Sequence, residues 1–215
     1  NLIFANGSLG TDLGADGVTL DDPGDPDTGS NQLQNFPGLT AALSVPGGTL
    51  VQGRLNSTAN ATFSIELFSS AACDPSGQGE GEKYSGSTSV TTNASGDATF
   101  AATLPSAAAV GQFVTATATG PDGTSEFGAC RQVQDAGGLT NDLIGTVQGL
   151  PGGVPKDGLI AKLQAALGSG KPASCNQLNA FINQVQGLLG SGLSQDEVDE
   201  LVAAANLIKQ SLGCP

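Results

Sequence analysis

The sequence predicts an α+β protein whose strands and helices lie in separate domains: an antiparallel, immunoglobulin-like β-sandwich first and a small antiparallel helical bundle last. Two observations support this. From residue 39 to residue 135, short segments in which apolar and polar residues alternate follow one another, separated by turn residues. From residue 139 onward, apolar residues recur at helical spacing. We expect three parts, with a terminal strand and acidic loop in 1–38, the sandwich in 39–135 and the bundle in 139–215.

The first predicted element is a short apolar strand at Leu2, Ile3 and Phe4, ended by the turn sequence Asn6-Gly7. A single strand has nothing of its own to bury against, so it must pair with the rest of the chain or with a neighbouring subunit. An apolar strand of this kind can extend an exposed sheet edge on a second copy. Leu2, Ile3 and Phe4 are therefore the predicted assembly residues, and a head-to-tail contact through them would build a homo-oligomer or a filament.

An acidic stretch follows from Asp12 to Pro37, with six aspartates, no lysine and no arginine. Its prolines and glycines exclude a regular helix or a central strand and predict a shaped loop. Calcium takes about six to eight oxygen ligands, which carboxylates on such a loop can supply. The alternative is a solvated acidic turn whose aspartates cap backbone amides. The candidate calcium ligands are Asp21, Asp25, Asp27 and Asn31, followed by Asp16 and Asp22.

Seven short strands are predicted after this loop, where alternations such as Phe63/Ile65/Leu67 place apolar side chains on one face. Turn residues separate the strands, for example at 46–48. Strands of this number and spacing fit a sandwich of immunoglobulin type. The expected ranges are 39–45, 49–56, 62–69, 84–92, 97–104, 111–119 and 124–133.

Four helices are predicted after the glycines at 137–138, each with an apolar stripe at i, i+3 and i+4 spacing. In the last of them, Ser194 and Glu197 have the spacing of a capping box. Glycine-rich stops at 168–170 and 190–192 end the second and third helices. Connections this short imply antiparallel neighbours and hence a small bundle. The expected ranges are 139–149, 157–168, 174–189 and 195–212.

The four cysteines are too far apart for metal sites of the C-x-x-C type, and four cysteines allow three disulfide pairings. Since two fall in each half of the chain, we expect Cys73–Cys130 and Cys175–Cys214. Each bond would close a long loop and stabilise the fold by about 3–5 kcal/mol. Disulfides indicate an oxidising, extracellular or cell-surface setting, and no apolar run is long enough to predict membrane insertion. Four buried free thiols are the alternative.

The net charge of −13 argues against nucleic acid as a partner, because binding to phosphates needs clustered Lys and Arg. The chain has no histidine, which removes the usual catalytic base and every Ser-His or Cys-His pair, so we expect no enzyme. Only 4% of residues are aromatic, a weak basis for sugar stacking. Glu80 and Glu82 could form an acid/base pair or a second cation site, but the glycines around them favour solvated charges in an exposed loop.

Two series of motifs carry a resemblance to known families. The run I-F-A-N-G-S-L-G-T-D-L-G-A-D-G-V-T, with the later segments F-S-I-E-L-F-S and V-T-T-N-A-S-G-D-A-T-F, resembles the last β-helix coil and the following sandwich of secreted bacterial proteins of the C-S-L-R-E-A-motif type. It covers about residues 1–133. The segments G-L-I-A-K-L-Q-A-A-L and L-N-A-F-I-N-Q-V resemble the FIMAH-type helical domain of secreted carbohydrate-active and surface proteins. The resemblance implies a secreted accessory module with no defined catalysis.

Together these observations predict a non-catalytic, secreted structural protein of the cell surface or extracellular matrix. It would bind calcium through the acidic loop and self-assemble into filaments through its N-terminal strand. The alternative is an accessory adhesion or binding module of a larger secreted protein, of carbohydrate-active or β-helix type, with a glycan or host surface as its unidentified ligand. A hydrolase built on Asp or Glu pairs is a third hypothesis, for which the sequence offers no recognisable site.

Overall fold

The computed structural model describes residues 2–105 and 108–215. The chain forms two compact units, Asn1–Val133 and Gln134–Pro215. Strands in two antiparallel sheets make up the first unit and four helices the second, so the predicted α+β class is confirmed. Among the described residues, no helix combines the length and the apolar character needed to span a membrane.

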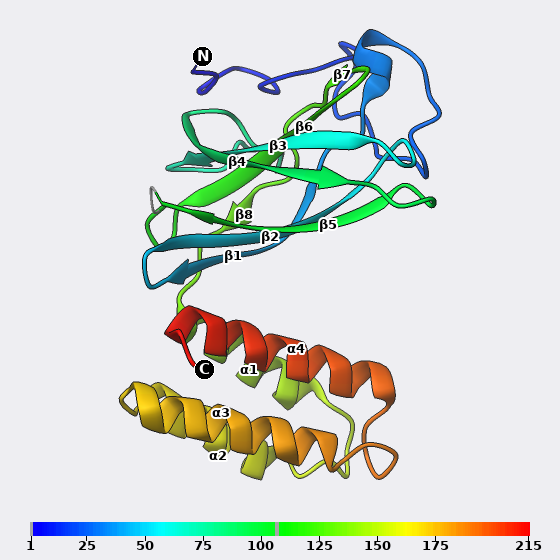
Figure 1. The fold of residues 1–215 in the computed structure, drawn as a ribbon. Coiled ribbons are helices and arrows are strands. Elements are labelled where there is room, and N and C mark those ends of the chain that lie inside the picture. The colour runs from blue at the N-terminus through cyan, green and yellow to red at the C-terminus, as the bar shows by residue number, and fades with distance from the viewer. Residues whose placement is uncertain (1, 106–107) are drawn as a thin grey trace. The chain divides into compact units, whose positions relative to one another are not determined.

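The first sheet joins β1 (Gly38–Val45), β2 (Gly48–Asn56) and β5 (Asp97–Leu104), with β2 in the centre (Figure 1). β1 and β2 pair antiparallel as a hairpin. The turn between them contains Gly47 at a φ of 95°, a left-handed conformation that glycine adopts without strain. The predicted turn at this point is therefore confirmed.

Five strands make up the second sheet: β3 (Thr62–Ser70), β4 (Lys83–Thr91), β6 (Phe113–Gly120), β7 (Gly123–Thr124) and β8 (Arg131–Gln132). Their order is β4-β3-β6-β7, and β8 also pairs with β6. β3 thus has antiparallel partners on both sides. Six of the predicted strands match the observed ones to within two residues at each end.

One hydrophobic core joins the two sheets. Alternation along β3 turns every second side chain inward, so Phe63, Ile65 and Leu67 are fully buried. Val51 of β2 and Phe100 of β5 enter the same core from the first sheet. Two antiparallel sheets over one core give this unit the sandwich-like arrangement that the alternation predicts.

The last predicted strand, 124–133, is wrong as a continuous element. The chain there forms only β7 and β8, with irregular backbone between them. The Ser125 hydroxyl accepts a hydrogen bond from the Ala118 amide at 2.9 Å and donates one to the Glu126 carbonyl at 2.7 Å. Side-chain hydrogen bonds therefore replace part of the strand pairing here.

The predicted N-terminal strand is also wrong. Ile3 forms one antiparallel bridge with Gly81, and its amide donates to the Gly81 carbonyl at 3.0 Å. Ala5 has a φ of 56°, which ends any extended run. The amides of Ala5 and Asn6 donate instead to the Glu80 carboxylate, at 2.9 and 3.1 Å. Contacts within the same chain therefore hold the N-terminal segment, whose partner could not be identified from the sequence.

Four helices form the second unit: α1 (Ala136–Gly149), α2 (Lys156–Leu167), α3 (Lys171–Gln186) and α4 (Gln195–Leu212). α1 and α3 each pack against both α2 and α4, which closes the predicted bundle (Figure 1). The apolar stripes meet in one core, with Leu159, Leu163, Phe181 and Val185 fully buried.

Side chains at the helix starts explain where three of the four helices begin. Asp135 caps α1 by accepting the Gly138 amide at 2.8 Å, so α1 begins before its predicted start at residue 139. Pro172 lies in the first turn of α3, which likewise begins earlier than predicted. The predicted capping box of Ser194 and Glu197 is present in α4.

Both predicted disulfides are confirmed. Cys73–Cys130 joins the loop after β3 to the segment that leads into β8. Cys175–Cys214 joins α3 to the residues after α4. The alternative of four free thiols is therefore excluded, since every cysteine is paired.

Candidate metal centre

Two buried amide side chains hold the acidic loop against the first unit. Gln34 and Asn35 are only 3% and 2% exposed. Asn35 Nδ2 donates to the carbonyls of Asp22 and Asn56 at 2.7 and 2.9 Å, and Asn35 Oδ1 accepts the Asp22 amide at 3.1 Å. Gln34 Nε2 donates to Ser57 Oγ at 2.8 Å. Side-chain amides thus give one shape to a loop that has no regular secondary structure.

A short 3₁₀ turn, η1 (Ser30–Leu33), precedes these amides (Figure 1). Asn31, Gln32 and Leu33 have φ angles of 51°, 52° and 54°. Left-handed conformations cost roughly 1–2 kcal/mol per residue and persist where the surroundings hold them. The surroundings do so here, since Asn31 Nδ2 donates to the Thr124 carbonyl at 2.8 Å and so ties η1 to β7.

Asp25 is the most strongly anchored carboxylate of the loop. Its Oδ2 accepts hydrogen bonds from Gln34 Nε2 at 2.8 Å and from the Ser57 hydroxyl, and its Oδ1 accepts the Asn35 amide at 3.2 Å. Asp25 also has a φ of 58°. The side chain is therefore fixed in direction before any ligand arrives.

Three aspartates converge around this anchor. Asp22, Asp25 and Asp27 each bring one carboxylate oxygen within 4.8 Å of the others. Asp22 Oδ1 and Asp27 Oδ1 are buried and have no hydrogen-bond partner among the described residues. A buried carboxylate oxygen without a donor is costly, and like charges at this separation repel. A cation held between the three carboxylates would offset both costs.

Desolvation raises the pKa of Asp25 and the pKa of Asp27 above the usual value of 3.8. At Asp25 the hydrogen bonds from Ser57 and Asn35 oppose the rise in pKa, while the charges of Asp27 and Asp22 add to it. At Asp27 the charge of Asp22 adds to the rise in pKa. The environment thus disfavours the ionised form of both groups when no cation is present.

Asp16 and Asp21 do not belong to this group, and the side-chain amide of Asn31 is bonded elsewhere. Asp21 Oδ1 accepts the Phe36 amide at 2.9 Å, and desolvation of its carboxylate raises the pKa of Asp21 to about 6. Asp16 lies near Asp12, whose Oδ1 accepts the Asp16 amide at 3.2 Å. Asn31 is engaged in anchoring η1. Asp12, Asp21 and Asp25 therefore accept backbone amides, as the alternative hypothesis of an acidic turn expects.

The donor set fits calcium. Carboxylate oxygens are hard ligands, and three carboxylates on one kinked loop match the ligand type that this ion prefers. Asp22, Asp25 and Asp27 would hold the ion, and water or backbone carbonyls would complete the shell of about six to eight oxygens. The ion would supply the positive charge that the loop lacks between Asp12 and Pro37.

The residues that position these carboxylates were not predicted from the sequence. Gln34, Asn35 and Ser57 make the hydrogen bonds described above, yet amides and hydroxyls are ordinary in a loop. One signal was available, because Gln34 and Asn35 stand directly before Phe36 and the first strand. Polar residues next to an apolar element are often drawn into the interior with it, where they need partners.

Glu80 and Glu82, expected as solvated charges in an exposed loop, also accept hydrogen bonds from the backbone. Both residues are half-buried. Glu80 accepts the two N-terminal amides described above and also Asn6 Nδ2 at 2.9 Å. Glu82 Oε2 accepts the Ala71 amide at 3.0 Å. Each carboxylate therefore fixes a neighbouring backbone segment.

A further carboxylate, Glu126, is buried at 2% exposure. Its Oε1 accepts the Leu13 amide at 2.9 Å and the Thr19 hydroxyl at 3.2 Å, and its Oε2 accepts the Thr19 amide at 3.0 Å. All three donors belong to the start of the acidic stretch. Glu126 therefore holds this part of the chain against the segment between β7 and β8.

Comparison with protein-family models gives no match for this sequence, and comparison with curated proteins gives no significant match.

Proposed function

We propose that this protein is a non-catalytic, secreted structural module of the cell surface or extracellular matrix, and that calcium stabilises its acidic loop. The observation that carries the proposal is the convergence of Asp22, Asp25 and Asp27, with two of their oxygens buried and without partners. A loop already fixed by Gln34 and Asn35 loses little further conformational freedom when an ion binds.

The two disulfides support the extracellular setting. Calcium sites of extracellular modules are weak, with dissociation constants of about 10⁻⁴–10⁻³ M. A site with three carboxylates, of which Asp25 is already hydrogen bonded, belongs in that range. The proposed site would therefore fill at extracellular calcium concentrations and serve stability.

We assign the first unit to the immunoglobulin-like sandwiches. If the strands β1 to β7 are lettered A, B, C, C′, E, F and G in chain order, the two sheets contain A-B-E and C′-C-F-G. This order differs from the constant-type immunoglobulin sandwich in that the fourth strand joins the sheet of C, F and G. The kinship with the secreted β-helix proteins and with FIMAH-type domains remains a proposal from the sequence motifs.

Self-assembly through the N-terminal segment is the second part of the proposal. The backbone of Ile3 is paired within the chain, so the case for assembly rests on the side chains beside it. Leu2 is 71% exposed and Phe4 is 46% exposed. Apolar side chains that stand out from an anchored segment are suited to burial against a second copy.

Calcium binding is tested by thermal unfolding of native protein and of the double variant Asp22→Asn/Asp27→Asn, in calcium and in chelator. The variant keeps the hydrogen bonds of Asp25 and Asn35. We expect calcium at ten times its dissociation constant to stabilise the native protein by about 1.4 kcal/mol and to leave the variant unchanged. In chelator the variant should be at least as stable as native protein, because the repulsion among the carboxylates of Asp22, Asp25 and Asp27 is removed.

The matched control for this test is Asp122→Asn/Glu200→Gln, which removes two exposed charges elsewhere. The control should gain as much from calcium as native protein does. Equal calcium stabilisation of the Asp22/Asp27 variant would refute the site.

Assembly is tested by light scattering of native protein and of Leu2→Ser/Phe4→Ser, both in millimolar calcium and in chelator. We expect large particles from native protein and monomers from the variant. The control is Leu189→Ser, which changes an apolar side chain of similar exposure, 49%, in the helical unit. Monomeric native protein in both solutions would end the filament proposal and favour the alternative of an accessory binding module.

A further inference from the structure

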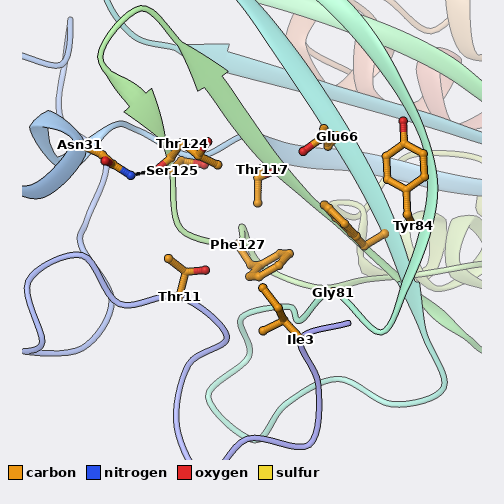
Figure 2. Close-up of a pocket in the computed structure, with 11 residues that line it drawn as sticks. Ile3, Thr11, Asn31, Glu66, Gly81, Tyr84, Thr117, Thr124, Ser125 and Phe127 are labelled. Atoms are coloured by element: carbon orange, nitrogen blue, oxygen red, sulfur yellow. Dashed lines mark hydrogen bonds between the residues drawn. The ribbon is translucent and has the colours of Figure 1, made fainter. Parts of the chain in front are cut away.

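A cavity of about 390 Å³ opens on the second sheet. Along β3, Glu66 and Phe68 alternate with the core residues, so they lie on the face of the sheet turned away from the core. Both line the cavity, together with Tyr84 of β4 and Thr117 of β6. Figure 2 shows these strands around the cavity, with Ile3 of the N-terminal segment as a further part of the wall.

Three of the chain's few aromatic residues gather in this wall. The rings of Phe68 and Tyr84 have centroids 5.8 Å apart at an interplanar angle of 73°, and those of Phe68 and Phe127 are 5.3 Å apart at 79°. Edge-to-face packing leaves ring faces available to a ligand. Tyr84 is 51% exposed, so about half of its surface is not used in the protein's own packing.

Glu66 places one negative charge beside these rings. It stands in β3, an inner strand of the sheet, opposite Ser87 of β4 and Thr117 of β6. The Glu66 side chain forms no hydrogen bond or ion pair with another residue of the described ranges, and the residue is half-buried. None of the described residues lining the cavity is a lysine or an arginine. The carboxylate is therefore uncompensated by the protein.

Thr117 is 3% exposed, and its hydroxyl has no hydrogen-bond partner among the described residues. Buried hydroxyls in folded proteins are normally paired. An unpaired hydroxyl opposite an unpaired carboxylate, in a wall that also contains aromatic rings, indicates a site built for a polar ligand with an apolar body.

We propose that this cavity binds a compact organic cation, an ammonium group carried on a short carbon chain. The ammonium would donate to the Glu66 carboxylate, and the carbon chain would lie against Phe68, Tyr84 and Phe127. Cations are attracted both to a carboxylate and to the faces of aromatic rings. A volume near 390 Å³ is at the small end for ligand pockets, which favours a ligand of few atoms. The proposal is independent of the calcium centre.

The test is a calorimetric titration with n-pentylammonium in the presence of chelator, with 1-pentanol as the neutral ligand of similar shape. We expect n-pentylammonium to bind native protein at least about tenfold more tightly than 1-pentanol does, the usual effect of a charged hydrogen bond. Glu66→Gln should abolish that difference. Tyr84→Leu, which keeps apolar bulk at a half-exposed position, should weaken n-pentylammonium binding about threefold to tenfold.

Glu200→Gln is the matched control, since it removes one exposed charge from the helical unit and should leave the affinity unchanged. A parallel titration with N-acetyl-lysine amide distinguishes the source of the cation: comparable affinity would indicate a lysine side chain of a partner, and binding of n-pentylammonium alone would indicate a free amine. The proposal is overturned if neither amine saturates the protein, if 1-pentanol binds equally well, or if Glu66→Gln binds the amine like native protein.

Discussion

At the residue scale, buried polar side chains rather than apolar ones determine how the irregular part of the chain is shaped. Asn35 and Glu126 are each 2% exposed. The Asn35 side chain donates a hydrogen bond to the Asp22 carbonyl, and the Glu126 carboxylate accepts one from the Thr19 amide, both in the acidic stretch. A buried carboxylate or amide is tolerated when donors and acceptors of the protein replace water. These two side chains therefore act as fixed points to which a loop without regular structure is bound.

The first prediction concerns Glu126. Glu126→Ala leaves the amides of Leu13 and Thr19 without an acceptor, and we expect a loss of about 3 kcal/mol of unfolding free energy in chemical denaturation. Glu126→Gln keeps one acceptor oxygen and should lose less. Hydrogen exchange should accelerate at both amides in the alanine variant. Glu200→Ala serves as the control, and unchanged exchange at Leu13 and Thr19 would contradict the role of Glu126.

At the element scale, side chains at the ends of helices determine where these begin. The carboxylate of Glu197 accepts the Ser194 amide at 2.8 Å, and this hydrogen bond, followed by the one from the Ser194 hydroxyl, lowers the pKa of Glu197. A carboxyl whose pKa is lowered by folding stabilises the fold above its unfolded pKa. That contribution disappears as the pH falls through the lower, folded pKa.

The second prediction follows from the lowered pKa of Glu197. Glu197→Gln should be less stable than native protein at neutral pH, and the difference should shrink as the pH falls below the usual value of 4.5 and vanish in stronger acid. Thermal unfolding of both proteins across this pH range measures it. Glu200→Gln, an exposed position of the same helix, should show no such dependence. A gap between Glu197→Gln and native protein that persists unchanged into strong acid would contradict the capping role.

At the scale of the whole molecule, each unit has a hydrophobic core and a disulfide of its own. A chain segment with its own core and cross-link meets the requirements for independent folding. The loop closed by Cys175–Cys214 spans 39 residues of the helical unit. In the chain-entropy model, a loop of that length contributes about 4 kcal/mol.

The third prediction is that residues 134–215, produced alone under oxidising conditions, form a helical protein with a cooperative thermal transition by circular dichroism. Replacing Cys175 and Cys214 together by serine should lower the unfolding free energy by about 4 kcal/mol. The control is the whole chain, in which the same double substitution should affect the transition of the helical unit and leave that of the sandwich in place. A disordered isolated segment would contradict the independence of the two units.

The sequence by itself determined the regular elements and the cysteine pairing. Period-two and helical patterns are local properties, so six strands and four helices follow from them to within a few residues. The division of four cysteines between two compositionally different halves predicted both disulfides.

Only the tertiary structure decided which polar side chains meet. Glu126 and Thr19 are separated by 107 positions, Asn31 and Thr124 by 93, and Asn6 and Glu80 by 74. No local period records such pairs, because a hydrogen bond depends on where two folded segments bring a donor and an acceptor together. For the same reason, six candidate ligands could be named from the sequence, and folding was needed to bring Asp22, Asp25 and Asp27 together without Asp16 and Asp21.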